Sequence, residues 1–501
     1  MIAHRLQPFS SSVTIVAVCL SALTLGGCMV GPDFHPPQPP VVPAGWVGVA
    51  EMPVGQPSLV TAQPADLAQW WRQFDDPTLT ALVEEALKMN LDLQIAIARL
   101  RQARAARGIV VGGLWPAVSA SGSYQRLRTA GTTSGDTQNL YEAGFDALWE
   151  LDFFGGKRRS VESADANVQA NIEVIRDVQV SLIAEVALNY IQLRGYQQGV
   201  LIAQNNLKAQ EHSAEITRKR LSVGFASALD VANADSNVAT TASQIPVLET
   251  AAQQSVYALS MLLAKQPAGL LKQLSPIGRL PKVPAEVPIG LPSDLLRRRS
   301  DIHQAEARLH AATAQIGVAI ADLFPSFSLT GLLNWHSNQL RTWWTAESSL
   351  SFAVGPSVTW PIFQGGSIIE NVHLQEALRD ETFITYQKTV LGAFQDVENA
   401  LVAFSKEQQH LKALNDAVIA NRKAVDMSLE LYTEGLIDFL SVLIAQRSLY
   451  ASEDALVQSE RNVATDLIAL YKALGGGWES VTSLSGVATP MTIVEARGNN
   501  K

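Results

Sequence analysis

The sequence predicts an α+β membrane protein that contains two copies of one unit, each with a two-stranded β-hairpin and a long helical hairpin. Three observations support this prediction: an internal repeat, two long segments without proline, and four segments in which apolar residues alternate with small or polar ones. The strands are too few for one chain to close a barrel, so the prediction includes association with further copies.

Composition excludes several classes of protein. Charged residues make up 17% of the 501 residues, against roughly 25% in an average soluble domain, and hydrophobic residues make up 47%. The net charge of -9 gives no bulk attraction for a phosphate backbone, so nucleic acid is excluded as a partner. Two cysteines are too few for a disulfide framework.

Residues 1–27 are predicted to be a signal peptide. His4 and Arg5 precede an apolar run from Val13 to Leu25, whose length of about thirteen residues suits a signal peptide and is too short to cross a bilayer as a helix. The run ends in LGGC, which resembles the lipobox of bacterial lipoproteins, in which Cys28 becomes the lipid-bearing first residue. The alternative is an ordinary cleavage site with an incidental cysteine.

Residues 28–65 are predicted to form a lipidated, proline-rich tether. Nine of the 23 prolines lie between Pro32 and Pro64, which is too many for a regular helix or a central strand. A lipid-modified cysteine needs a spacer, and an extended chain at about 3.1 Å per residue supplies one. The alternative is a disordered leader without a task.

The repeat divides the remaining chain. Motifs of the first copy recur about 210 residues later in the same order. The matched segments are Leu114-Trp115-Pro116 with Leu323-Phe324-Pro325, Phe153 and Gly155-Gly156 with Phe363 and Gly365-Gly366, and Gly224, Leu229 and Val231 with Gly435, Leu440 and Val442. The predicted domains are repeat 1 at 66–265, a proline-rich linker at 266–292, repeat 2 at 293–478, and a C-terminal tail at 479–501 without an assigned role.

Each copy is predicted to contain a long helical hairpin. No proline lies between Pro116 and Pro246 or between Pro361 and Pro490. The residues Val390, Phe394, Val397, Leu401 and Phe404 step by 4, 3, 4 and 3, which is coiled-coil spacing. A single helix from Lys157 to about Leu221 would be about 100 Å long. The chain is expected to turn near Gly224 and near Gly435 and to return as a second helix.

Four segments have the alternation of β-strands. They are the stretches 118–124, 141–151, 327–336 and 350–360. A soluble sandwich would alternate too, but the strands are few, are long enough to cross a bilayer, and carry Trp149, Trp335 and Trp360 near their ends. Two chains would supply eight strands and three would supply twelve, and the small, polar inward faces favour the wider, water-filled barrel.

Five motifs carry a resemblance to a known family. In order they are CMVGPDF from Cys28, WWRQFDDPTLTALVEEAL from Trp70, GLPSDLLRRRSDIHQAEARL from Gly290, FPSFSLTG from Phe324 and WPIFQGG from Trp360. Together they resemble the TolC-like outer membrane factors, specifically the NodT-type lipoprotein branch of RND multidrug efflux systems. The resemblance covers residues 28–478.

The resemblance implies fold, location and partners. It implies a homotrimer whose twelve strands form one barrel in the outer membrane, continued by a barrel of twelve helices through the periplasm. It also implies a periplasmic adaptor (membrane fusion) protein, an inner membrane RND-type pump, and a passive conduit for drugs or other small amphiphilic compounds. The lipid on Cys28 would anchor each chain in outer membrane lipid.

The resemblance also assigns site residues. The turns of the helical hairpins would be the periplasmic tip that contacts the adaptor, through Gly224, Asp230, Val231, Gly435 and Val442. The alternative for the glycines is a role as helix caps alone. The channel gate would lie on the returning helix of the second copy, with Leu440 and Ile444 as an apolar constriction and Arg447 as an ion-pair donor or, alternatively, an exposed helix residue.

One departure concerns this gate. Relatives often carry an aspartate where this chain has Ile444, which argues against an acidic ring and for a constriction that closes by dewetting.

Enzymatic functions find no support. The eight histidines are scattered, no His-Glu-x-x-His or clustered Cys/His spacing occurs, and Gly155-Gly156-Lys157 lacks the remaining residues of a phosphate loop. No cofactor is predicted. Two other functions stay open: an outer membrane conduit for a type I protein secretion system, and a periplasmic helical scaffold lipoprotein. The sequence does not identify the transported substrates, the pump, the adaptor or the acyl chains.

Overall fold

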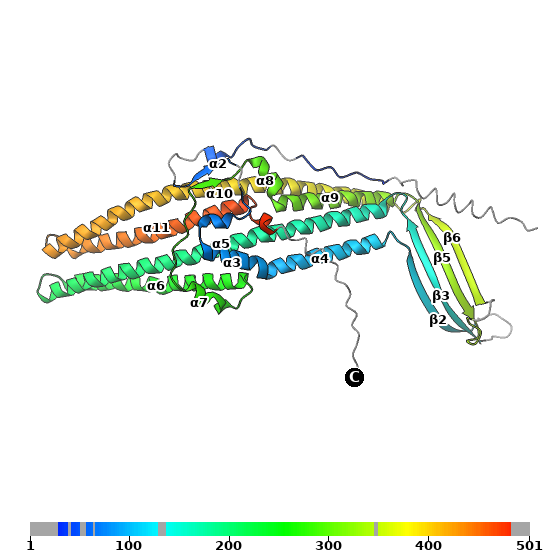
Figure 1. Cartoon of the computed structure of the whole chain (residues 1–501), viewed down its shortest axis with the longest axis horizontal. Coiled ribbons are helices and arrows are strands. Elements are labelled where there is room, and N and C mark those ends of the chain that lie inside the picture. The colour runs from blue at the N-terminus through cyan, green and yellow to red at the C-terminus, as the bar shows by residue number, and fades with distance from the viewer. Residues whose placement is uncertain are drawn as a thin grey trace, which may run out of the picture. The chain divides into compact units, whose positions relative to one another are not determined.

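The computed structural model describes residues 29–38, 42–50, 57–63, 66–128, 137–344 and 349–481 (Figure 1). It divides into two compact units: unit 1 comprises Met1–Gln38, Arg99–Ile172 and Gln304–Tyr386, and unit 2 comprises Pro39–Ala98, Glu173–His303 and Gln387–Lys501. The predicted signal peptide, the lipidation site Cys28 and most of the predicted C-terminal tail lie outside the described residues.

Unit 1 contains a four-stranded antiparallel sheet. Its strands are β2 (Ala117–Arg128), β3 (Thr137–Leu151), β5 (Ser326–Ser337) and β6 (Leu350–Thr359), in the order β2-β3-β5-β6. Figure 1 shows these four strands side by side. All four strands predicted from alternation are confirmed, and each repeat supplies one hairpin.

The sheet is largely uncovered in the single chain. Every residue of β2 is exposed, and Phe352 and Val354 of β6 point apolar side chains into open space. Within the described residues, no strand pairs with the outer edge of β2 or of β6. Exposed apolar faces and unpaired edges are unfavourable in water, so they are candidate contact surfaces for other strands or for an apolar surrounding.

The strand ends are fixed by the same hydrogen bond in both repeats. Trp149, near the end of β3, donates its indole N–H to the Leu114 carbonyl at 2.9 Å. Trp360, directly after β6, donates to the Leu323 carbonyl at 3.1 Å. Two tryptophans predicted near strand ends therefore tie them to the segment that precedes the first strand of each hairpin.

Long helices supply residues to both units. They are α4 (Leu91–Gly112), α5 (Gly156–Ser222), α9 (Ser300–Ala321) and α10 (Ser367–Glu434). The predicted single helix from Lys157 to about Leu221 is confirmed by α5, which has 67 residues. The returning helices are α6 (Ala228–Leu262), which contains Pro246, and α11 (Phe439–Ala473). None of the helices in the described part of the chain is both long enough and apolar enough to pass through a bilayer.

Most of the predicted coiled-coil positions lie in the core of unit 2, whereas Phe394 of α10 is half-buried. Val390, Val397, Leu401 and Phe404 of α10 are fully buried, as are Ile183 and Val186 of α5. The core is completed by η1 (Trp70–Phe74) and α3 (Pro77–Met89). Trp70 stacks on Tyr471 with ring centroids 5.1 Å apart, so residues at the two ends of the unit 2 sequence meet in one aromatic cluster.

The proline-rich segments contain short regular elements. These are α2 (Val47–Ala50), β1 (Leu59–Thr61), η2 (Pro267–Leu270), α7 (Leu271–Leu274), β4 (Glu286–Pro288), α8 (Pro292–Arg298) and, after α11, η4 (Trp478–Val481). β1 pairs with β4 in parallel. The prolines are compatible with these elements, because α2 and β1 are short and β1 fits between Pro57 and Pro64.

We expect Trp70→Ala to lower the free energy of unfolding by about 3–5 kcal/mol, because it leaves a cavity beside Tyr471. Trp70→Phe should cost less, since the buried Trp70 Nε1 has no hydrogen-bond partner among the described residues. Urea unfolding of the purified protein measures both. Phe225→Ala, at an exposed aromatic residue of the same unit, is the control, and an equal loss in the control would contradict the prediction.

Candidate functional site

The two helical hairpin turns have the same backbone geometry. Gly224 and Gly435 both have φ of +82°, a left-handed backbone conformation that residues with a side chain adopt only at an energetic cost. In the first turn Phe225 N–H donates to the Arg220 carbonyl at 2.8 Å, and in the second Leu436 N–H donates to the Leu431 carbonyl at 2.9 Å. Each outgoing helix thus ends in a Schellman motif whose glycine is required by the backbone.

The returning helices begin with caps built from the same two residue types in opposite order. At the start of α6, Ser227 Oγ accepts a hydrogen bond from Asp230 N–H at 3.1 Å, and the Asp230 carboxylate accepts one from Ser227 N–H at 2.8 Å. At the start of α11, Asp438 accepts hydrogen bonds from the Ser441 N–H at 3.2 Å and the Ser441 hydroxyl at 2.9 Å. Ser441 stands where the first copy has Asp230, and it takes part in the cap as the residue whose N–H and hydroxyl donate to Asp438.

Apolar side chains are exposed around both turns. They are Val223, Phe225, Leu229, Leu436 and Leu440, each more than half exposed. The glycines could be assigned from the sequence, but most of these apolar residues were not, although apolar residues directly after a turn glycine were a usable signal. Exposed apolar groups on a turn favour contact with another protein surface.

Val442 does not belong to this surface. Its side chain is 0% exposed and packs in a cluster with Tyr432 and Phe439, beneath the turns. The prediction that Val442 contacts an adaptor is therefore not supported in this chain, because the side chain is covered by its own neighbours. Val231, in the corresponding position of the first copy, is half-buried, and Asp230 is occupied in its cap.

Arg220 joins the two hairpin turns. Its Nη1 donates to the Tyr432 carbonyl at 2.8 Å and to the Thr433 carbonyl at 3.0 Å, at the end of α10. Its guanidinium lies 4.6 Å from the centroid of the Tyr432 ring. A cation at the C-terminal end of a helix is favoured by the helix dipole, so Arg220 of the first hairpin stabilises the end of the second.

The predicted gate residues share one face of α11. Leu440, Ile444 and Arg447 are spaced by four and three residues, so they lie along one stripe of the helix. Leu440 is 53% exposed and Ile444 is 57% exposed. Arg447 Nε donates to Asn237 Oδ1 of α6 at 3.2 Å, so its polar contact here is to an amide of the same chain rather than to a carboxylate.

One carboxyl on α11 has a perturbed proton affinity. Burial, together with the neighbouring Glu407 carboxylate of α10, raises the pKa of Asp466 from 3.8 to about 6. Among the described residues, no group of three His, Cys, Asp or Glu side chains is arranged to hold a metal ion. The side chains described on these helices pack against one another, cap helix ends and place charges.

The chain is similar to a family of known proteins along both repeats. The family profile described as outer membrane efflux protein matches residues 82–265 and 291–476. The chain is 34% identical over 480 residues to the probable efflux pump outer membrane protein TtgC of Pseudomonas putida, which covers 94% of this chain and 96% of TtgC. It is 32% identical over 463 residues to Nodulation protein T of Rhizobium leguminosarum bv. viciae, with 92% and 93% covered.

Solved structures show the same fold. The outer-membrane channel OprN has a TM-score of 0.83 and 38% identity, over 90% of this chain and 100% of OprN. CusC, described in connection with transmembrane channel formation, has a TM-score of 0.78 and 28% identity, over 90% of this chain and 100% of CusC.

We expect Asp438→Ala to destabilise the second turn by about 1 kcal/mol, because the Ser441 amide loses its acceptor. The double variant Asp438→Ser with Ser441→Asp copies the first cap and should retain most of the stability. Amide hydrogen exchange at Ser441 reports both. Exchange in the double variant as fast as in Asp438→Ala would show that the two caps are not interchangeable.

We expect the free energy of unfolding to fall as pH rises from about 4 to about 6 through the titration of Asp466. In this window the folded chain holds a proton that the unfolded chain has released, so folding is favoured at the lower pH. Asp466→Asn should flatten this part of the urea midpoint profile and raise stability near neutral pH. The exposed Asp416→Asn is the control, and a wild-type slope in Asp466→Asn would contradict the assignment.

Proposed function

The chain belongs to the outer membrane efflux protein family, and from this premise we propose that it is the outer membrane channel component of a tripartite efflux system. The observation that carries the proposal is the four-stranded sheet of unit 1, with exposed apolar side chains and two unpaired edges. The names of TtgC and OprN support the same function.

The assembly follows from the free edges. Three copies of a four-stranded sheet give twelve strands, and pairing β6 of one copy with β2 of the next satisfies every edge. A barrel of that size leaves room for water, so the homotrimer would be a passive conduit and not an enzyme. Solutes of the relevant class are drugs or other small amphiphilic compounds delivered by an RND-type pump in the inner membrane.

The turns are proposed as the contact surface for a periplasmic adaptor protein. The surface comprises Gly224, Gly435 and the exposed Val223, Phe225 and Leu436, which offer bare backbone and apolar side chains to a partner helix. Asp230 supports this surface as a cap, and Val442 supports it from the core.

The location is proposed to be the outer membrane, with the helices extending into the periplasm. The mature chain would start at Cys28 after removal of residues 1–27, and its lipid would be inserted in the membrane that holds the sheet. The remaining domain boundaries, from the repeats at 66–265 and 293–478 to the tail at 479–501, belong to the same proposal.

Deletion of the gene is expected to raise susceptibility to several unrelated drugs and dyes, because the pump loses its exit, and expression of the intact chain should restore resistance. Minimal inhibitory concentrations measure the effect. Unchanged susceptibility together with the loss of a secreted protein from the medium would contradict the proposal and indicate a type I secretion conduit.

Leu440→Ser and Ile444→Asp are each expected to raise the closed-state current in single-channel recordings. Both changes place a polar side chain in the proposed apolar constriction on the exposed stripe of α11, so that water enters the constriction more readily. Ile419→Ser, at an exposed apolar residue of α10 outside this stripe, is the control. Closed-state currents equal to wild type in both gate variants would exclude these residues from the gate.

A further inference from the structure

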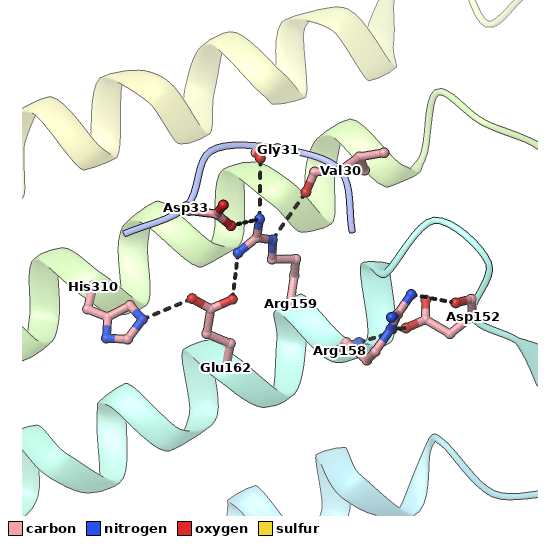
Figure 2. A network of polar contacts seen from close by, with 8 residues as sticks. All are labelled: Val30, Gly31, Asp33, Asp152, Arg158, Arg159, Glu162 and His310. Atoms are coloured by element: carbon pink, nitrogen blue, oxygen red, sulfur yellow. Dashed lines mark hydrogen bonds and ion pairs between the residues drawn. The ribbon is translucent and has the colours of Figure 1, made fainter. Parts of the chain in front are cut away.

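Arg159 is a buried cation at the start of α5 with four polar partners. Its side chain is 1% exposed. Nη1 donates to Glu162 at 2.7 Å, Nη2 donates to Asp33 at 2.7 Å and to the Gly31 carbonyl at 3.3 Å, and Nε donates to the Val30 carbonyl at 3.1 Å (Figure 2). Three of the four partners belong to residues 29–35, which we call the strap. A buried guanidinium without these partners would be left largely uncompensated.

The strap fits its position by close backbone contact. Gly31 has φ of +86°, and a Cβ there would lie 2.4 Å from the Gly317 Cα of α9. Gly155 has φ of +81°, and a Cβ there would lie 2.4 Å from Met29 Cγ. Val30 N–H donates to the Phe154 carbonyl at 3.0 Å. In both close contacts at least one partner is a glycine, and its missing Cβ leaves room for the strap to lie against the protein.

Both repeats contribute to this binding. Arg159 and Glu162 lie on α5 of repeat 1, whereas Gly317 and His310 lie on α9 of repeat 2. The Phe34 ring stacks on the His310 ring with centroids 4.3 Å apart. His310 Nε2 lies 2.9 Å from Glu162 Oε1 (Figure 2). The strap therefore closes over two helices that are far apart in the sequence.

We propose that the strap fixes the lipid-bearing end of the chain and that Arg159 is its positioning residue. Met29 alone separates Cys28 from the docked Val30 in the sequence, and two residues of extended chain span at most about 7 Å. Phe154, which holds Val30, follows the end of β3 closely. The acyl group is thus held close to the end of the sheet, and no long spacer separates it from the folded protein. This inference rests on the proposed acylation of Cys28.

Limited proteolysis tests whether the strap is docked through Arg159. Chymotrypsin cleaves after exposed phenylalanine, and Phe34 of the acylated, detergent-purified protein should be protected while it stacks on His310. Arg159→Gln should speed cleavage at Phe34 by about tenfold or more, since cleavage follows the population of the open strap. Arg107→Gln is the matched control, because it removes an arginine ion pair to α5 at Asp165 and not at the strap.

Gly31→Val opens the strap without changing the buried arginine, because the added side chain collides with Gly317. It should also speed cleavage at Phe34 and leave the remaining chain resistant. Cleavage in the wild type as fast as in Gly31→Val, or an equal effect of Arg107→Gln and Arg159→Gln, would overturn the docked strap.

A linker insertion tests whether the anchor must be fixed. About ten Gly and Ser residues inserted between Cys28 and Met29 lengthen the connection between the lipid and the strap, which lowers the effective concentration of the lipid near the strap. The amount of assembled outer membrane protein should fall several-fold, whereas the same insertion after Gln38, beyond the strap, should leave it unchanged. Equal yields of assembled protein from the two insertion variants would overturn the proposal that the acyl group must be held close to the sheet. Mass spectrometry of Cys28 in the same preparation separates a failure of the proposed acylation from a failure of the strap.

Discussion

Unpaired backbone groups along two strand edges are the constraint on which the rest of the structure depends. The outer edges of β2 and β6 present N–H and C=O groups that have no partner in the described part of the chain. In hydrocarbon each such group costs several kcal/mol, so a four-stranded sheet is stable there only when its edges are joined to others. The two repeats are a consequence, because each supplies one hairpin and the pairing of β3 with β5 joins them into one sheet.

The repeats preserve geometry more strictly than residue identity. Trp149 and Trp360 make the same indole hydrogen bond to Leu114 and Leu323, and Gly224 and Gly435 have the same φ. The side chains around them differ freely. This pattern is expected where the backbone conformation is fixed by hydrogen bonds and by the absence of a Cβ, since few residue types satisfy those requirements.

The sequence predicted what is encoded by local periodicity. Strands such as β3 and β6 alternate along their length, and α5 has no proline to interrupt it, so both could be found without the structure. Contacts between distant segments could not be found. The pairing of β1 with β4, the burial of Val442 under the turns, and the binding of Asp33 to Arg159 depend on which segments meet in space, and no spacing along the chain encodes that.

The reversed caps of α6 and α11 have an evolutionary consequence. At α6 Ser227 and Asp230 exchange hydrogen bonds, whereas at α11 Asp438 accepts both bonds from Ser441, and conversion of one arrangement into the other requires two substitutions. The intermediate with two aspartates brings like charges together, while the intermediate with two serines keeps a hydroxyl acceptor for the first turn. A route through the serine pair therefore avoids the repulsion of two carboxylates, and a segment exchanged between the two halves keeps its cap when both positions move together.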